Sequence, residues 1–448
     1  MSSGRAVFES RIGVILATAG SAVGLGNIWR FPYEAGQNGG AAFILIYIAF
    51  AIVLGVPAML CEFVIGRHSR ANASRAYGRG LWKAVGYMGV LTGFIIMGFY
   101  SVVAGWTLHY VAAAVMGRLS GDADYFKNFF VEFSSHPVKP IVWSLLFMLL
   151  THYIISRGIQ RGIERVSKVM MSLLFVLLVV LVVCSLCLPG AWAGVEFLFK
   201  PDFSKVTSTM LFEALGQTFF SLSIGMAALC TYASYFSRQT NLARSAAQIV
   251  AIDSLVAILS GLMIFPAAFS VGVAPDSGPS LIFITLPNVF QQAFAAVPLV
   301  GYVVSILFFL LIAIAALTSV ISMHEVPTAF VCEEFRVGRK LAAGSVTAAA
   351  MAVGVFCSLS MGPCPWLRLF GKNLFDFFDF LTADVLLTGG GFLTCIYVGW
   401  FVPTRISYLE ISNRGTLRIR FYHIFIFAVR YVCPILIAMI FLHRLNWL

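Results

Sequence analysis

The sequence predicts an all-α protein that crosses a membrane many times and is built from two inverted halves. Hydrophobic residues fill 60% of the 448 positions, charged residues only 11%, and the mean hydropathy is +0.92, which excludes a soluble domain. Eleven apolar stretches are long enough to cross a bilayer, and the first and sixth are interrupted at mid-depth. These observations predict 11 transmembrane helices, with spans 1–5 and 6–10 as inverted five-helix repeats and span 11 added.

The spans are placed where the chain stays apolar for about 20 residues, the length that an α-helix needs to cross the hydrocarbon core. We expect them near residues 12–35, 41–66, 84–116, 139–156, 166–189, 208–236, 245–272, 298–331, 341–360, 377–402 and 421–442. Two further segments are expected to be helices that do not cross: Leu281 to Phe294, and the basic, amphipathic stretch from Arg67 to Lys83.

Lysine and arginine indicate how the chain lies in the membrane. With the N-terminus inside, 20 of the 30 Lys and Arg fall in inner segments and 8 in outer segments, while Arg30 and Arg430 lie within spans. Because basic residues favour the cytoplasmic side, we expect a cytoplasmic N-terminus, an outer C-terminus and a cell (inner) membrane location. This distribution explains the net charge of +11 without a nucleic-acid partner.

The interruption of span 1 lies in the stretch SAVGLGNIWRFP, residues 21–32. Gly20, Gly24 and Gly26 break the helical pattern, and Asn27 and Arg30 place an amide and a charge at membrane depth. A broken helix in a bilayer must satisfy its freed backbone groups against protein, water, an ion or a ligand. A tight helix crossing is the alternative, because Gly20 and Gly24 are spaced for one, but it leaves Asn27 and Arg30 unexplained.

Span 6 carries a matching interruption, where Ser221, Ser223 and Gly225 fall at mid-depth. Spans 1 and 6 are five apart and therefore face opposite ways across the membrane. Paired interruptions of this kind indicate an inverted-repeat transporter with a binding site at the midplane. We therefore expect a single transporter domain over residues 1–448, with the first repeat at 11–200, the second at 205–402 and the extra span within 403–448.

Several motifs resemble the neurotransmitter:sodium symporter family, in particular its bacterial eleven-span amino-acid transporters. They are GLGNIWRFP (24–32) followed by NGG (38–40), LGQTFFSLSIG and TYASY in span 6, ITLP (284–287), ALTS (316–319) and GIER (162–165). The resemblance implies a sodium-coupled symporter that works by alternating access and is not an enzyme. Glu62 also matches the family, where it supports the two helix breaks by hydrogen bonding.

The resemblance also implies two sodium sites, built from the oxygen ligands that a hard cation prefers. The first would use Ala22, Asn27, Ser221 and Asp253, and the second Gly20, Val23, Ala315, Thr318 and Ser319. The alternative for the hydroxyls of Thr318 and Ser319 is a hydrogen bond to their own helix.

Asp253 departs from the common pattern of the family, in which many relatives carry asparagine at this position. Chloride-dependent relatives have a serine one turn later, where this chain has Ala257. A buried carboxylate costs roughly 2.5–3.5 kcal/mol at a span centre, so a counter-cation is expected beside it. We expect transport without chloride, with Asp253 able to exchange a proton on the return step. The alternative is a carboxyl group paired with a neighbouring hydroxyl.

The substrate implied by the resemblance is an amino acid, because the amine transporters of the family carry an aspartate where Gly24 stands. The amides of Leu25 and Gly26 begin a helix and suit a carboxylate. The expected substrate-binding residues are Ala22, Gly24, Leu25, Gly26, Ile96, Tyr100, Phe220, Ser221, Ser223, Gly225, Met226, Ser319 and Met323. Two methionines give an adaptable wall, which favours hydrophobic and aromatic L-amino acids. For each methionine alone, ordinary core packing is the simpler interpretation.

Two gates are expected by the same resemblance. The outer gate would pair Arg30 with Asp379, and the inner gate would pair Arg5 with Glu333, beside Phe8, Ser234 and Tyr235. Exposed ion pairs contribute about 0–1 kcal/mol, which suits contacts that must open. Phe8 replaces a tryptophan common in relatives, and Ser172 replaces a proline. Asp384, Glu34 and Glu213 have no expected role.

Other functions are compatible with parts of the sequence. A channel needs a continuous polar lining, whereas the polar residues here converge on two breaks. An intramembrane enzyme would need a motif such as H-E-x-x-H or G-x-S-x-G, and neither occurs. A proton-coupled amino-acid transporter and a non-transporting amino-acid sensor both remain open. The sequence does not indicate an oligomeric state.

Overall fold

A computed structural model of the chain describes residues 6–272 and 281–444. The first five spans are formed by α1 (Arg11–Ala22), η1 (Gly26–Arg30) and α2 (Phe31–Gln37); α3 (Ala41–Phe50), η2 (Ala51–Gly55) and α4 (Val56–Ser69); η3 (Gly80–Trp82) and α6 (Lys83–Val115); α8 (Lys139–Ser156); and η4 (Ile159–Glu164) and α9 (Arg165–Leu186).

The later spans are formed by α11 (Ser208–Ser221) and α12 (Ala228–Ala233); α13 (Leu242–Ser270); α15 (Pro298–Glu334); α16 (Arg339–Met361); α17 (Leu374–Phe380), η7 (Leu381–Leu387), α18 (Thr388–Ile396) and η8 (Tyr397–Phe401); and α20 (Tyr422–Phe427), η9 (Ala428–Val432) and α21 (Cys433–Arg444).

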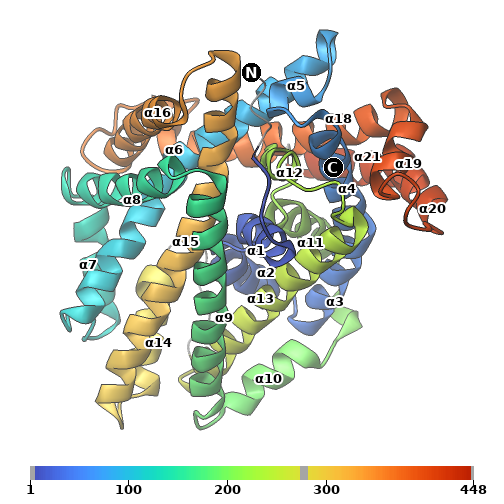
Figure 1. Ribbon diagram of the computed structural model, residues 1–448. Coiled ribbons are helices and arrows are strands. Elements are labelled where there is room, and N and C mark those ends of the chain that lie inside the picture. Colours follow the sequence, from blue (N-terminus) through green and yellow to red (C-terminus); the bar gives the residue numbers. More distant parts are fainter. Residues whose placement is uncertain (1–5, 273–280, 445–448) are drawn as a thin grey trace.

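The connections contain α5 (Ala73–Ala76), α7 (Ala123–Ser134), α10 (Ala191–Phe199), η5 (Phe203–Lys205), η6 (Leu281–Thr285), α14 (Leu286–Ala293), α19 (Thr404–Ile411) and the antiparallel strands β1 (Arg368–Leu369) and β2 (Lys372–Asn373). Figure 1 shows α1, α2 and α13 in the middle of the bundle, with α8 and α16 at one side and α19 and α20 at the other.

The predicted spans agree with these helices at most boundaries. Within residues 6–272 and 281–444, nine helices are long and apolar enough to cross a membrane, and the two parts of span 1 form a tenth that is bent by 57°. The sixth span consists of two short helices separated by residues 222–227, so the count of eleven stays a prediction. Span 5 begins at Ile159 rather than near residue 166, because the wide helical turn η4 extends it.

The segment from Arg67 to Lys83 is not a helix of its own, and that prediction is wrong. Helix α4 continues to Ser69 and ends where Arg70 adopts the left-handed conformation, with φ of 48°. Only the four residues of α5 and the single turn η3 follow, because Gly78 and Gly80 interrupt the chain with positive φ. The predicted helix at Leu281 to Phe294 is confirmed as η6 and α14.

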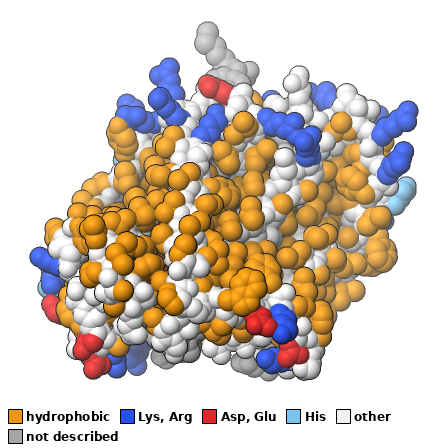
Figure 2. All heavy atoms as spheres, turned by 90° about the horizontal axis from the view of Figure 1, so that it is seen from below, with side chains coloured by type: hydrophobic (Ala, Val, Ile, Leu, Met, Phe, Trp, Pro, Cys, Tyr) orange, Lys and Arg blue, Asp and Glu red, His pale blue; other side chains and the backbone are white. Residues whose placement is uncertain are grey.

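The surface is that of a membrane protein. Figure 2 shows a broad belt of hydrophobic side chains across the molecule, with mostly Lys and Arg along one edge and both acidic and basic groups at the opposite edge. Such a belt fits the hydrocarbon core of a bilayer, and the basic edge fits the side that we expect to face the cytoplasm.

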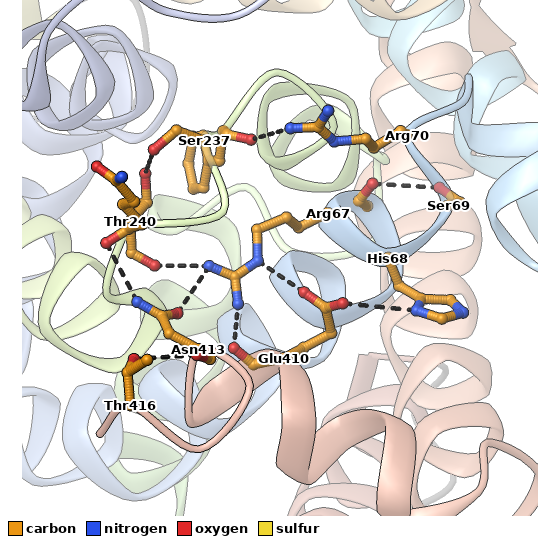
Figure 3. A network of polar contacts seen from close by, with 12 residues as sticks. Arg67, His68, Ser69, Arg70, Ser237, Thr240, Glu410, Asn413 and Thr416 are labelled. Carbon is orange, nitrogen blue, oxygen red and sulfur yellow. Dashed lines mark hydrogen bonds and ion pairs between the residues drawn. The ribbon is translucent and has the colours of Figure 1, made fainter. Parts of the chain in front are cut away.

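A polar cluster fixes the end of α4 to α19, as Figure 3 shows. The buried guanidinium of Arg67 donates from Nε to a carboxylate oxygen of Glu410 at 2.7 Å and contacts the Glu410 carbonyl. The same group donates to the Thr240 carbonyl at 2.6 Å and to Asn413 Oδ1 at 3.1 Å, while His68 lies 3.5 Å from Glu410. Arg67 thereby joins span 2 to the loop after span 6 and to the helix between spans 10 and 11.

Candidate functional site

The break in span 1 is held by its own side chains. Helix α1 ends at Ala22, and the chain bends before η1 begins at Gly26. The Asn27 side-chain oxygen accepts a hydrogen bond from the Gly24 N–H at 3.0 Å, which satisfies one freed backbone group. A Cβ atom at Gly24 would lie 2.4 Å from Ser319 Oγ, so glycine leaves room here for the Ser319 hydroxyl of α15.

The break in span 6 follows Ser221, the last residue of α11. Ser223, Gly225 and Ala227 have φ of 55°, 96° and 60°, which are left-handed conformations that a helix cannot contain. The buried carboxylate of Glu62 accepts hydrogen bonds from the N–H of Gly225 at 2.7 Å and of Cys230 at 3.0 Å. Glu62 therefore replaces backbone partners that span 6 has lost, as its place in the sequence suggested.

The two breaks face each other across the centre of the bundle. Asn27 Nδ2 donates to Ser221 Oγ at 3.1 Å, and Ser223 Oγ donates to the Ser21 carbonyl at 3.1 Å. Gln217 Nε2 also reaches the Gly26 carbonyl at 3.3 Å. The polar groups predicted from two distant stretches of sequence thus lie side by side.

Asp253, on α13, lies directly behind the two breaks and is fully buried. Its carboxylate accepts hydrogen bonds from Tyr47 at 2.9 Å, Ser221 at 2.8 Å and Asn27 Nδ2 at 2.8 Å. All three donors are uncharged, so none of them is a counter-ion for the carboxylate. Ala257, one turn later, has no group that could bind an anion. Hydroxyl, amide and carboxylate groups around Asp253 provide the oxygen ligands that suit a hard cation.

The residues of the predicted second sodium site meet where α1 crosses α15. Ser319 Oγ lies 3.3 Å from the Val23 carbonyl oxygen, and a Cβ atom at Gly20 would lie 3.3 Å from Thr318 Cβ. The Thr318 hydroxyl donates to the carbonyl of Ala315 at 3.0 Å, which is the back-bonding considered as the alternative. Five predicted ligands therefore lie close together.

A cavity of about 480 Å³ extends from the two breaks to the outer ends of spans 10 and 11. Twelve of the thirteen predicted substrate residues line it: Ala22, Gly24, Leu25, Gly26, Ile96, Tyr100, Phe220, Ser221, Ser223, Met226, Ser319 and Met323. Gly225 is not among the lining residues and instead packs against the Leu387 carbonyl. The Tyr100 hydroxyl lies 3.4 Å from the Leu25 nitrogen, at the start of the outer half of span 1.

Ten uncharged lining residues have no counterpart in the predicted set: Ser21, Trp29, Tyr33, Phe99, Val103, Met361, Phe375, Thr382, Ala383 and Leu387. They are aromatic, apolar or small residues in otherwise ordinary helical stretches, so nothing in the sequence marks them as cavity residues. Glu34, Asp376, Asp384 and Arg444 also line the cavity and carry charges at its outer end.

On the outer side, Arg30 lies over the Phe220 ring, with its guanidinium carbon 4.7 Å from the ring centroid. The ion pair that Arg30 makes in this conformation is with Glu34, at 3.7 Å, one helical turn away. Asp379, the predicted partner, lines the same cavity. The Arg30–Asp379 pair therefore stays a prediction.

On the inner side, the N-terminal segment packs against the inner end of span 6. The buried Phe8 ring contacts the rings of Tyr232, Tyr235 and Phe236, and the Phe8 N–H donates to the Tyr235 carbonyl at 3.1 Å. The Tyr235 hydroxyl donates to Glu325 at 2.7 Å.

The predicted Arg5–Glu333 pair stays a prediction, because Arg5 lies outside the described residues. Glu333 accepts a hydrogen bond from the Asn72 N–H at 2.8 Å. Ser234 is buried beside Tyr235. The ion pair of Glu325 with Arg339, at 2.5 Å, is a further inner contact that the motifs did not indicate.

Comparisons with known proteins agree with this geometry. The model of the sodium:neurotransmitter symporter family matches residues 5–123 and 116–447. A sodium-dependent transporter of Bacillus subtilis is 40% identical over 98% of this chain and 97% of its own length. One from Methanocaldococcus jannaschii is 30% identical over 88% of this chain and 82% of its own.

A solved structure also matches the fold. The crystal structure of MhsT in complex with L-phenylalanine has a TM-score of 0.88 and 40% sequence identity, and the match covers 98% of this chain and 100% of that chain. The chain belongs to the sodium:neurotransmitter symporter family and is a sodium-dependent membrane symporter rather than an enzyme.

Proposed function

We propose that this symporter imports hydrophobic L-amino acids, including aromatic ones, together with sodium and without chloride. The observation that carries the proposal is the pair of facing helix breaks, with a buried carboxylate on one side and the cavity on the other. Freed backbone groups, hydroxyls and a carboxylate in one place can bind a cation and a zwitterion together.

The amino-acid backbone would bind at the broken helices. Its carboxylate would accept from the amides of Leu25 and Gly26, at the positive end of the outer half of span 1, and from the Tyr100 hydroxyl. Its ammonium group would donate to the carbonyls of Ala22 and Phe220, the second of which also accepts from the Ser223 N–H at 3.1 Å. Gly24 supports an amino acid over a simple amine, because a side chain there would meet Ser319 and glycine offers no acidic group at this position to hold the ammonium.

The substrate side chain would extend between Ile96, Met226 and Met323, which all line the cavity. Methionine side chains adapt to different apolar shapes and make favourable contacts with aromatic rings. The complex of MhsT with L-phenylalanine supports an aromatic substrate for this chain, since the two proteins are 40% identical over nearly their whole lengths.

Sodium would occupy two sites, at Ala22, Asn27, Ser221 and Asp253 and at Gly20, Val23, Ala315, Thr318 and Ser319. Asn27 would offer its side-chain oxygen to the first ion by turning its amide group through half a rotation. The Asp253 carboxylate would balance the charge that chloride balances in other relatives, because its hydrogen-bond partners are all neutral. On the return step Asp253 would bind a proton in place of sodium.

For the wider architecture, we propose the inverted repeats at 11–200 and 205–402, an N-terminus in the cytoplasm and a C-terminus outside. The basic edge in Figure 2 supports this orientation. The cytoplasmic membrane of a bacterium is the location that fits eleven spans and the relative in Bacillus subtilis.

Uptake into proteoliposomes tests the proposal directly. The purified protein is supplied in turn with each of the twenty amino acids, in sodium chloride, sodium gluconate and potassium chloride. We expect saturable uptake of hydrophobic and aromatic amino acids that is equal in the two sodium salts and absent in potassium. Uptake driven by a pH gradient without sodium would favour proton coupling, binding without uptake would favour a sensor, and collapse in gluconate would contradict chloride independence.

A further inference from the structure

Arg444, the last residue of α21, reaches into the outer end of the cavity and contacts two other spans. Its Nη2 atom lies 2.9 Å from a carboxylate oxygen of Glu213 on α11, close enough for a hydrogen bond as well as an ion pair. Its Nε atom lies 3.7 Å from a carboxylate oxygen of Asp384 on η7. One side chain therefore joins spans 6, 10 and 11, and we term Arg444, Glu213 and Asp384 the outer clasp.

The surroundings of Arg444 are shaped for this contact. Gly216 lies one turn after Glu213, and a Cβ atom there would be 3.1 Å from Arg444 Nη2, so glycine leaves room for the guanidinium. The neighbouring His443 ring stacks on Phe212 with centroids 4.4 Å apart and planes 14° apart, which holds the end of α21 against α11. The side chains of all three clasp residues are only 21–23% exposed, so water screens the ion pairs less than at an open surface.

Arg444 differs from Arg30, the other basic residue of the cavity, in its ionic partners. Arg30 and Arg444 are the two basic residues that line it, against the acidic Glu34, Asp376, Asp379 and Asp384. Arg30 is occupied by Glu34 and by the Phe220 ring. Among the described residues, Arg444 is the basic residue that forms ion pairs with Glu213 and Asp384, and without it two carboxylates near each other would repel.

We propose that Arg444 is a positioning residue of the outer gate, which joins the outer ends of spans 6, 10 and 11 at a fixed distance and so stabilises the outward-facing conformation. The proposal rests on the proposed function, because it assigns a conformational step to that transport cycle. The conformation described here fits this role, since Phe8 and its neighbours close the inner side while the cavity extends to the clasp. The ion pairs of Arg444 with Glu213 and Asp384 must then break before the outer side closes.

The test measures how fast a thiol in the outer part of the cavity reacts from outside. Ala383→Cys places a reporter beside the clasp, and the native Cys187 and Cys364, which are exposed or half-buried, are replaced by serine. A neutral, membrane-impermeant thiol reagent is used, because a charged one would respond to the altered potential of the cavity. The ratio of rates without and with saturating sodium gives the fraction of outward-facing protein.

Arg444→Gln is expected to lower the equilibrium ratio of outward-facing to closed protein about fivefold. This change corresponds to roughly 1 kcal/mol for a partly buried ion pair. Glu213→Gln should act in the same direction, and the charge exchange Arg444→Glu with Glu213→Arg should restore the equilibrium ratio towards that of the parent protein. Lys200→Gln is the matched control, since Lys200 pairs with Glu196 at 2.6 Å on the exposed outer surface, away from the cavity.

Equal equilibrium ratios for Arg444→Gln and Lys200→Gln would overturn the proposal, and so would a charge exchange that restores nothing. If Arg444→Gln does not fold, Arg444→Lys and Asp384→Asn replace it. Arg444→Lys should leave the ratio of outward-facing to closed protein nearly unchanged, and Asp384→Asn should lower it. The labelling needs no substrate. If the parent protein takes up no amino acid, the proposed function is contradicted. If Arg444→Gln is nevertheless labelled more slowly, the proposed role of Arg444 is still supported.

Discussion

Replacing Asp253 by asparagine removes the formal charge from the cluster behind the two helix breaks while nearly keeping its shape. The carboxylate accepts three hydrogen bonds from neutral donors and is fully buried. With its oxygen at the Oδ2 position, an asparagine can still accept from Ser221 and Tyr47. Its amide nitrogen then replaces the oxygen that accepts from Asn27, whose side-chain amide has to turn over. The fold should therefore survive, and the main loss should fall on the cation that we place beside this residue.

The size of the effect follows from the charges. Two unit charges about 4 Å apart attract by about 4 kcal/mol at an effective dielectric constant of about 20. Part of this is offset, because the buried carboxylate no longer has to be desolvated. We expect sodium binding to weaken by about 1.5–3 kcal/mol, which is roughly tenfold to 150-fold in the dissociation constant.

The assay is a sodium titration of L-phenylalanine binding to purified Asp253→Asn protein, in chloride and in gluconate. Ser260→Ala is the matched control, because Ser260 lies on the same helix and its hydroxyl bonds to the Val256 carbonyl at 2.8 Å. Adding Ala257→Ser to Asp253→Asn should recover sodium affinity in chloride only. An unchanged sodium midpoint in Asp253→Asn, or a recovery that ignores chloride, would refute the reasoning.

Three further substitutions test other parts of the structure. Glu62→Gln replaces a charged acceptor of two span 6 N–H groups, and we expect the protein to lose about 1–3 kcal/mol of stability, seen as a lower unfolding midpoint in detergent. Gly24→Ala should leave folding intact but reduce sodium-dependent uptake more than about tenfold, because its Cβ would displace the Ser319 hydroxyl. Arg67→Gln should destabilise by about 1–3 kcal/mol, because Glu410 loses its buried partner, and an unfolding midpoint equal to that of the parent would contradict this.

Hydropathy and glycine placement predict most of the fold. A long apolar run indicates a span. The break in span 1 is indicated by Asn27 and Arg30 among glycines, because polar and charged residues are costly in a bilayer without partners. The helices α7, α10 and α19 are not predicted, since they are short, lie in connections and depend on neighbours that hydropathy does not show. The prediction of a helix in the basic segment after α4 is wrong for a related reason. Its composition suits a helix, but Gly78 and Gly80 bend the chain.

Some residues of the candidate site can be predicted from the sequence, and others cannot. Residues with a special group at membrane depth, such as Ser221 and Asp253, are found together as expected. Contacts between elements distant in sequence are harder to predict, because partner choice depends on conformation. Arg30 pairs with Glu34 here, and Arg444 lies at the end of the chain in a stretch without any motif. Aromatic lining residues such as Trp29 look like ordinary core residues in the sequence.

The central claim is that the two facing breaks bind sodium and an amino acid together, and reciprocal coupling tests it most directly. Sodium affinity is measured by calorimetry on the purified protein, with and without saturating L-phenylalanine. Because the first sodium and the substrate carboxylate would share a site, the amino acid should tighten sodium binding about tenfold or more, and sodium should tighten amino-acid binding by the same factor. A sodium affinity that does not change when the amino acid is present would contradict the account.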